Sequence, residues 1–410
     1  MFKPALITAA AAALAAALAN AAVATAETPS PEEMWAIVQQ QQKEIERLRG
    51  RLGETEAKVE ATGDMVEAAQ AEDTGAAPGW WDRTYIGGYG EMHYNGGDTD
   101  EIDFHRFVLF FDHDFNDQLR FTSELEVEHA FTGTNGDVEL EQAYLEYTIN
   151  PNFVPRAGLF LVPVGILNEI HEPNTFFGTE RNRVENDIIP TTWWEAGVGM
   201  RGELGAGFAY DVSVHSGLNV PTTGNNAFRI RNGRQKVSQA TAKDGAITGR
   251  IKWTGMPGVE LALSGQYQND ITQNGLGIDA ILITAHADIR RGPWGLRALY
   301  ARWDLADGPP ATGPARIGAD EQYGWYIEPS YRFDVPGMGS QGELGIFARY
   351  SQRDRTAGDS VESDIRQFDI GANYWPHHDV VLKVDGQFEF LPTGSGTGDN
   401  RLNVGLGYHF

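Results

Sequence analysis

Hydrophobic and polar side chains alternate along most of the chain after Trp80. The C-terminus shows the pattern most plainly, because one set of alternate positions is Leu402, Val404, Leu406, Tyr408 and Phe410 and the other is Arg401, Asn403, Gly405, Gly407 and His409. A period of two places these sets on opposite faces of a β-strand. Residues 119–128, 367–374 and 380–390 repeat the pattern. Stretches of about ten residues have the length that a tilted strand needs to cross a bilayer.

The connections between these stretches separate a barrel from a soluble β-sandwich, in which side chains would also alternate. Short turns, such as Asn116-Asp117 and Gly205-Ala206-Gly207, alternate with longer polar loops, such as residues 219–244 and 306–320. Bacterial barrels have an even number of strands, short turns at one rim and long loops at the other. The pattern therefore predicts an all-β fold, a transmembrane antiparallel β-barrel of about 16 strands over residues 80–410.

The N-terminal region predicts three further segments. Lys3, an Ala- and Leu-rich run and the small-x-small triplet Ala24-Thr25-Ala26 indicate a signal peptide over residues 1–26. Residues 27–70 carry apolar residues at a seven-residue spacing, which predicts a periplasmic coiled-coil oligomerisation helix. Gly50, Gly53 and Gly63 weaken that helix, so a single solvated helix or a disordered spacer remains open. Residues 71–79 have the composition of a linker.

Composition narrows the classes of function. The chain has 57 acidic and 32 basic residues, for a net charge of −25, which argues against a nucleic-acid partner. It has no cysteine, which excludes thiol nucleophiles, thiolate metal sites and disulfides. No Gly-x-Ser-x-Gly motif is present, and His377-His378 lies in a turn where the pair is expected to be solvated. We therefore expect no enzyme, no catalytic residue, no metal site and no cofactor.

Two segments and the C-terminus resemble a known family. The chain ends in Tyr408-His409-Phe410, which resembles the insertion signal of bacterial porins. Residues 156–165 (RAGLFLVPVG), followed by a long loop and then residues 193–199 (WWEAGVG), resemble the phosphate-selective porin O/P family. The resemblance implies a homotrimeric sixteen-stranded barrel in the outer membrane that passes small anions, phosphate among them. Its expected partners are membrane lipid and lipopolysaccharide.

The width of such a barrel predicts a water-filled lumen. A ring of about 16 strands is too wide for side chains to fill, so its inward face is expected to be polar. Residues 166–192 form the third long loop, and they include more apolar residues than a solvated loop would carry. We predict that this loop folds into the lumen and narrows the pore. An exposed lid or protein-binding loop remains the alternative.

The alternation also assigns charged side chains to the lumen. The basic residues on strands that we expect to line the pore or bind solute are Arg106, Arg120, Arg156, Arg201, Arg250, Lys252, Arg349 and Lys383. Arg181 and Arg183 lie on the narrowing loop, and Glu124, Glu126 and Glu195 represent inward acidic residues that are at least as numerous. Anion pores need clustered Arg and Lys. Opposed acidic and basic walls, or a segregated basic stripe, are both compatible with the sequence, and strict phosphate selectivity is not expected.

These features predict an outer-membrane porin for passive diffusion of small hydrophilic solutes or ions, including anions such as phosphate. The alternative is a structural barrel that the coiled-coil stalk tethers to the cell wall. Ionic conductance separates the two, because a tether with a plugged lumen would carry no current.

Overall fold

The computed structural model describes residues 79–97, 100–130, 136–338, 341–392, 395–396 and 398–410. The expected signal peptide and coiled-coil helix, and residues 71–78 of the linker, lie outside the described residues. A short 3-10 helix, η1 (Trp80–Arg83), precedes the first strand. The strands are β1 (Thr84–Gly96), β2 (Glu101–Asp114), β3 (Leu119–Glu128), β4 (Val138–Tyr147), β5 (Val154–Leu161), β6 (Trp194–Gly205), β7 (Phe208–His215), β8 (Ala246–Met256), β9 (Val259–Gln268), β10 (Ala280–Arg291), β11 (Trp294–Leu305), β12 (Glu321–Pro336), β13 (Gln341–Asp354), β14 (Ile365–His377), β15 (Val380–Phe390) and β16 (Arg401–His409).

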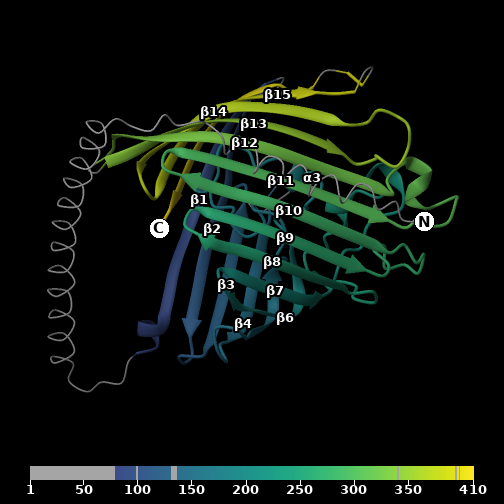
Figure 1. The fold of residues 1–410 in the computed structure, drawn as a ribbon, viewed down its shortest axis with the longest axis horizontal. Coiled ribbons are helices and arrows are strands. Elements are labelled where there is room, and N and C mark those ends of the chain that lie inside the picture. The colour runs from purple at the N-terminus through teal and green to yellow at the C-terminus, as the bar shows by residue number, and fades with distance from the viewer. Residues whose placement is uncertain (1–78, 98–99, 131–135, 339–340, 393–394, 397) are drawn as a thin grey trace, which may run out of the picture. The chain divides into compact units, whose positions relative to one another are not determined.

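The sheet closes on itself. Each strand pairs antiparallel with its neighbours in sequence, and β1 pairs antiparallel with β16, from Tyr89 opposite His409 to Gly96 opposite Leu402. Figure 1 shows the tilted strands side by side in sequence order. Closure removes the unpaired edges that an open sheet would expose. The predicted all-β antiparallel barrel of sixteen strands is confirmed.

The two rims of the barrel differ in their connections. At the turn rim the strands are joined by short turns such as Ala206-Gly207 and Pro257-Gly258, and at the loop rim by segments as long as 162–193 and 216–245. Ala206 and Gly207 have φ angles of 52° and 81°, the backbone of a tight two-residue hairpin. A side chain at Gly207 would lie 2.2 Å from the Cα of Gly255, so glycine is required there.

The outer surface of the barrel is apolar. Side chains that are more than one-third exposed on this surface include Leu125, Val198, Leu263, Ile283, Ile327, Ile370, Leu382 and Val384. They belong to the strand faces that alternate with buried inward positions. An apolar outer band is the surface that lipid tails contact in a membrane barrel.

Among the described residues, no helix is both long enough and apolar enough to cross a membrane.

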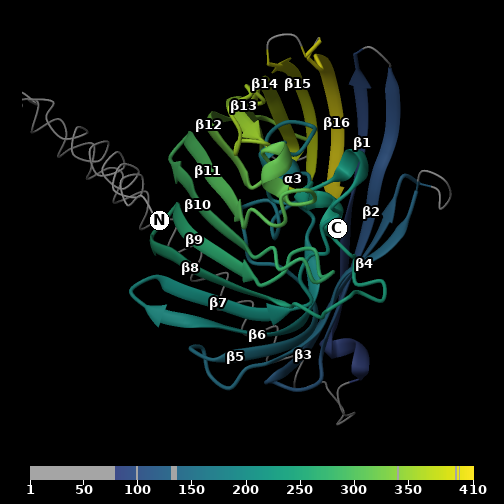
Figure 2. The same cartoon turned by 90° about the vertical axis from the view of Figure 1, so that its right-hand side faces the viewer.

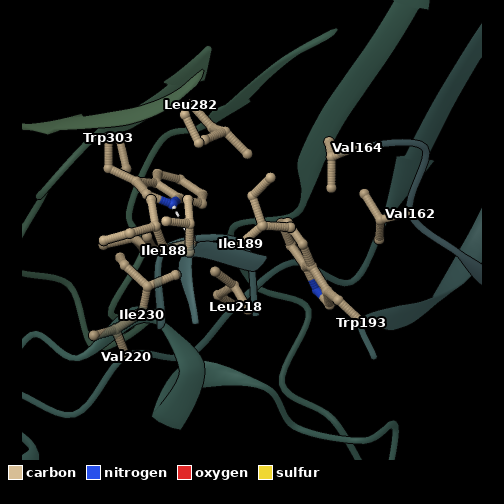
Figure 3. Close-up of a cluster of buried hydrophobic side chains, with 14 of the residues drawn as sticks. Val162, Val164, Ile188, Ile189, Trp193, Leu218, Val220, Ile230, Leu282 and Trp303 are labelled. Carbon is tan, nitrogen blue, oxygen red and sulfur yellow. Dashed lines mark hydrogen bonds between the residues drawn. The ribbon is translucent and has the colours of Figure 1, made fainter. Parts of the chain in front are cut away.

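The connection between β5 and β6, residues 162–193, lies inside the barrel, and we call it the lumenal loop. Figure 2 shows its short helix α3 (Val184–Asp187) within the ring of strands. The apolar side chains of this loop pack against the inner wall of β10 and β11 together with residues of the loops that follow β7, β9 and β11. In Figure 3, Trp303 of β11 lies against Ile188, and its indole Nε1 donates a hydrogen bond of 2.9 Å to the Ile188 carbonyl.

The sequence predicts a polar inward face, and one part of the inner wall departs from this. Leu282 on β10 and Leu299, Ala301 and Trp303 on β11 point inward and are buried. These positions contact the apolar lumenal loop rather than water, so the hydrophobic effect favours apolar side chains there. The polar part of the interior is therefore restricted to the remainder of the wall.

Candidate functional site

The lumenal loop is held in place by a buried carboxylate. Glu185 is fully buried, and its Oε2 accepts hydrogen bonds from the backbone N–H groups of Ile166 (2.8 Å) and Leu167 (2.7 Å). Its Oε1 accepts a hydrogen bond of 2.7 Å from the Tyr326 hydroxyl on β12. A buried carboxylate is stable only when its oxygens are paired in this way. Glu185 thus ties the two ends of the loop to each other and to the wall.

Basic side chains of the wall form a second set of anchors. The Arg349 guanidinium contacts Asp369 Oδ2 (2.9 Å) and Glu328 Oε2 (3.0 Å) and donates to the Phe177 carbonyl (3.3 Å). Lys383 donates to the Gly178 carbonyl (2.9 Å), and its ammonium lies 3.6 Å from the centre of the Phe176 ring. These two residues position the loop on β13 and β15.

Most of the predicted pore-lining residues lie on the inner face but are buried. Side chains less than one-tenth exposed are Arg106, Arg156, Arg349, Lys383, Glu124, Glu126 and Glu195. Several of them form ion pairs inside the protein: Arg106 contacts Glu91 (2.7 Å) and Glu126 (3.0 Å), and Arg156 contacts Asp211 (2.8 Å). Residues buried this far hold the interior together rather than face a column of water.

The remaining predicted residues are more accessible. Arg120 and Arg201 lie near the turn rim with side chains 44% and 54% exposed and pair with Asp112 and Glu146. A hollow of about 330 Å³ at that end of β5 to β8 is lined by Arg201, Arg250 and Lys252 among others. Arg250 pairs with Glu169 of the lumenal loop, and Lys252 lies 3.6 Å from Glu260.

A second hollow, of about 310 Å³, lies near the loop rim between the lumenal loop and the ends of β2 to β4, and we call it the charged hollow. Its basic residues are Arg106, Arg181, Arg183, Arg231, Arg234 and Lys236, and its acidic residues are Glu128, Glu139, Glu141 and Glu180. The structure thus brings the predicted Arg106, Arg181 and Arg183 together. Arg120, Arg156, Arg349 and Lys383 do not belong to it.

The cations of the charged hollow differ in their pairing. Lys236 pairs with Glu139, whereas Arg181 donates to the Thr192 hydroxyl (2.8 Å) and Arg231 and Arg234 donate to backbone carbonyls of the lumenal loop. Within the described part of the chain, no carboxylate lies within 4.0 Å of Arg181, Arg231 or Arg234. Burial, followed by the charges of Arg234 and Arg181, lowers the pKa of Arg231, yet a guanidinium stays charged at neutral pH. The charged hollow therefore contains three arginines that form no direct ion pair with a carboxylate of the described residues.

Sequence reasoning missed part of this cluster. Arg231, Arg234 and Lys236 belong to the connection 216–245, whereas the prediction considered strand faces and the lumenal loop. A signal was present, because the segment 228–236 (FRIRNGRQK) contains four basic residues and no acidic one. A basic run of this kind in a loop indicates an anion-attracting surface.

Strand irregularities also bring unexpected side chains into the interior. Between Glu91 and His93 the register shifts, so that β2 carries one extra residue, and both His105 and Arg106 line the charged hollow. In β4 the extra residue is Glu141, because Glu124 pairs with Gln142 and Leu125 with Leu140. A β-bulge redirects side chains in this way, and a strict period of two cannot show it.

A closed barrel with an apolar exterior, a loop folded into its lumen and charged hollows inside defines the class of outer-membrane porins. The chain belongs to the phosphate-selective porin O and P family, whose pattern matches residues 83–385, and the resemblance seen in the sequence is confirmed. The protein is accordingly an outer-membrane porin-like channel, and its family and fold are those of non-enzymatic channels.

Known proteins resemble the chain in sequence and in fold. An uncharacterized protein of Aquifex aeolicus (strain VF5) is 32% identical over 329 residues, which cover 73% of this chain and 74% of the relative. The outer-membrane channel DcaP of Acinetobacter baumannii has a TM-score of 0.54 at 15% identity, covering 80% of this chain and 97% of that one. OmpF of Salmonella typhi, solved in complex with daunomycin, has a TM-score of 0.54 at 14% identity and the same coverage. At these identities the two structures support the fold alone.

Proposed function

We propose that the protein is a passive diffusion channel that favours small anions, phosphate-sized ions included, over cations of the same size. The observation that carries this proposal is the cluster of Arg181, Arg231 and Arg234, which lack carboxylate partners among the described residues and line the charged hollow. Clustered guanidinium groups attract and orient anions because they present a fixed fork of N–H donors.

The acidic net charge of the chain does not oppose this preference. Exposed charges separated by more than a Debye length, about 8 Å at physiological ionic strength, are largely screened from each other. An ion inside the lumen therefore responds mainly to the nearest side chains. In the charged hollow, Glu139 is paired with Lys236, and Glu180 Oε1 lies 3.2 Å from His93 Nδ1. These contacts leave the local balance in favour of the arginines.

Strict phosphate selectivity is not part of the proposal. Glu128 also lines the charged hollow, and no ion pair joins it to another described residue. Mixed charge of this kind weakens discrimination among anions, because a multiply charged ion is attracted by the arginines and repelled by the carboxylate. We propose a general preference for small anions.

The alternative remains a barrel that serves as a structural tether. In planar bilayers a channel gives stepwise current increases, whereas a plugged tether gives none. We also propose that the barrel assembles as the homotrimer that the family resemblance implies, behind the signal peptide and coiled-coil segment expected from the sequence. The apolar outer band supports contact with membrane lipid.

The reversal potential across a KCl gradient tests the preference, and we expect its sign to show that chloride permeates faster than potassium. In Arg181→Gln/Arg231→Gln/Arg234→Gln the ratio of anion to cation permeability should fall by about tenfold. The reason is that one charge at about 6 Å contributes roughly 0.7 kcal/mol even in water, or about threefold in ion occupancy. Three such charges contribute up to about thirtyfold, and screening by salt reduces this toward tenfold. Added phosphate should lower the chloride current of the wild type more than that of the variant.

A matched control makes the same change of net charge elsewhere. Arg290, Arg291 and Arg316 are exposed and lie outside the charged hollow. Their replacement by glutamine should leave the permeability ratio close to that of the wild type. A cation-selective wild type, or equal ratios in the two triple variants, would rule out the proposal.

A further inference from the structure

Three buried side chains meet where the lumenal loop passes β3 and β4. Glu124 of β3, Glu141 of β4 and His171 of the lumenal loop are 2%, 1% and 2% exposed. Glu124 Oε1, Glu141 Oε2 and both ring nitrogens of His171 are buried and have no hydrogen-bond partner among the described residues. Buried polar atoms without partners are rare in native proteins and call for an explanation such as a bound ion.

The backbone and a neighbouring side chain build this arrangement. Glu141 is the extra residue of the bulge in β4, so Glu141 joins Gln142 in facing the interior. Gln142 Nε2 donates a hydrogen bond of 2.7 Å to Glu124 Oε2, which fixes that carboxylate and leaves Oε1 directed at His171. Bulges of this kind occur preferentially where a strand must aim a side chain at a site.

Both distances from His171 to the two carboxylates match the edge of a metal coordination tetrahedron. His171 Nε2 lies 3.5 Å from Glu124 Oε1 and 3.4 Å from Glu141 Oε2, and the three ligand atoms all lie within 4.8 Å of one another. Zinc binds imidazole nitrogen and carboxylate oxygen at about 2.0–2.2 Å, so two ligands of a tetrahedral ion lie about 3.3–3.6 Å apart. Direct hydrogen bonds would be shorter than the observed distances.

The charge of the cluster also fits a divalent cation. In the described part of the chain, no Lys or Arg side chain lies within 4.0 Å of the Glu124 or Glu141 carboxylate, and His171 is their common neighbour. Two buried carboxylates side by side are costly unless a positive charge compensates both. Nitrogen and oxygen ligands with three protein donors are typical of zinc.

We propose that Glu124, Glu141 and His171 bind one divalent cation of the zinc type, which fastens the lumenal loop to β3 and β4. The ion has a structural role here, because it joins segments that are far apart in the sequence and takes no part in a reaction. This inference does not require the ion selectivity proposed above, although Glu141 also lines the charged hollow.

A proton is the competing occupant of the same gap. Burial of the ring and the charge of Arg181 oppose protonation, but the facing carboxylates outweigh them and raise the pKa of His171 to about 9. Without the metal the ring would then bridge the carboxylates as an imidazolium ion. Metal titration separates the two occupants, because only the cation site takes up zinc with defined stoichiometry.

The test uses the full-length protein purified in detergent and stripped with a chelator. Calorimetric titration of the wild type with zinc chloride should show one site per chain. In Glu141→Gln and in His171→Gln the affinity of that site for zinc should be at least about 100-fold lower. Cobalt(II) at the same site should give the intense visible spectrum of tetrahedral coordination. Zinc should also raise the unfolding temperature of the wild type and not that of Glu141→Gln.

The chain offers a control in another cluster of histidine and carboxylate side chains. Asp103, His105 and His129 lie near the loop rim, but there the carboxylate contacts the Nδ1 atoms of both rings, at 3.0 and 2.9 Å. The double variant His105→Gln/His129→Gln should therefore bind zinc at Glu124, Glu141 and His171 with the affinity of the wild type. Retention of β-sheet circular dichroism verifies that each variant folds. Zinc affinity that is unchanged in both Glu141→Gln and His171→Gln, or absent from the wild type, would overturn the proposal.

Discussion

Replacing Arg349 with alanine should lower the free energy of unfolding by about 3–5 kcal/mol, the cost typical of breaking a buried ion pair by removing one partner. The substitution leaves the carboxylates of Glu328 and Asp369 buried without their shared cation. It also removes the donor to the Phe177 carbonyl, so the lumenal loop loses an anchor to β13. Urea unfolding from lipid vesicles measures the loss, and the open-channel current should become noisier.

Arg290 provides the control for Arg349. Its side chain is 55% exposed and lies 3.6 Å from Asp288, an ion pair of the exposed kind that contributes at most about 1 kcal/mol. Arg290→Ala should therefore change stability by less than about 1 kcal/mol. If the two variants lost equal stability, Arg349 would not be the buried anchor described here.

The second large effect is expected on the opposite face of the wall. Leu263 lies in the middle of β9 with its side chain 57% exposed, between the outward-facing Ile251 and Ala285 of the adjacent strands. Arginine at a lipid-facing position near the bilayer centre costs about 2–4 kcal/mol. Leu263→Arg should lower the stability of the vesicle-folded barrel by that amount.

The same substitution on the inner face serves as the comparison. Ala209 of β7 lines the hollow at the turn rim, where an added guanidinium can remain hydrated. Ala209→Arg should therefore cost much less than Leu263→Arg. Comparable losses at the two positions would contradict the assignment of the apolar face to lipid.

The fold was predictable because the barrel obeys local rules. Side chains alternate up to Tyr408-His409-Phe410 because the strand is pleated. Tight turns and long loops occupy different rims because the barrel crosses a bilayer. The apolar content of residues 166–192 predicted a loop that folds into the lumen and narrows the pore, and apolar side chains of this segment are buried against the inner wall. The narrowing of the pore stays a prediction. Each of these signals is carried by neighbouring residues and does not depend on distant contacts.

The candidate site was less predictable because burial inside a barrel depends on distant segments. Alternation placed Arg349 and Lys383 on the inner face, but only the folded loop shows that Phe177 and Gly178 cover them. The bulge at Glu141 shifts the period by one residue without a distinctive sequence. Arg231 and Arg234 line the charged hollow from a loop. The position of that loop in the folded barrel cannot be predicted from the residues next to it in the sequence.

The charged hollow exists only if the lumenal loop is fixed inside the barrel, and a disulfide tests this position most directly. A Cβ atom at Gly405 of β16 would lie 3.1 Å from the Thr179 Cγ2 atom, close to the reach of a disulfide, and the chain has no other cysteine. Oxidised Thr179→Cys/Gly405→Cys should lose its free thiols in the folded barrel and keep the same conductance before and after reduction. Thr179→Cys/Ser264→Cys, which pairs the loop with the opposite wall, should keep both thiols free. Free thiols in the first pair after oxidation, or equal cross-linking in both pairs, would contradict a loop fixed against β16.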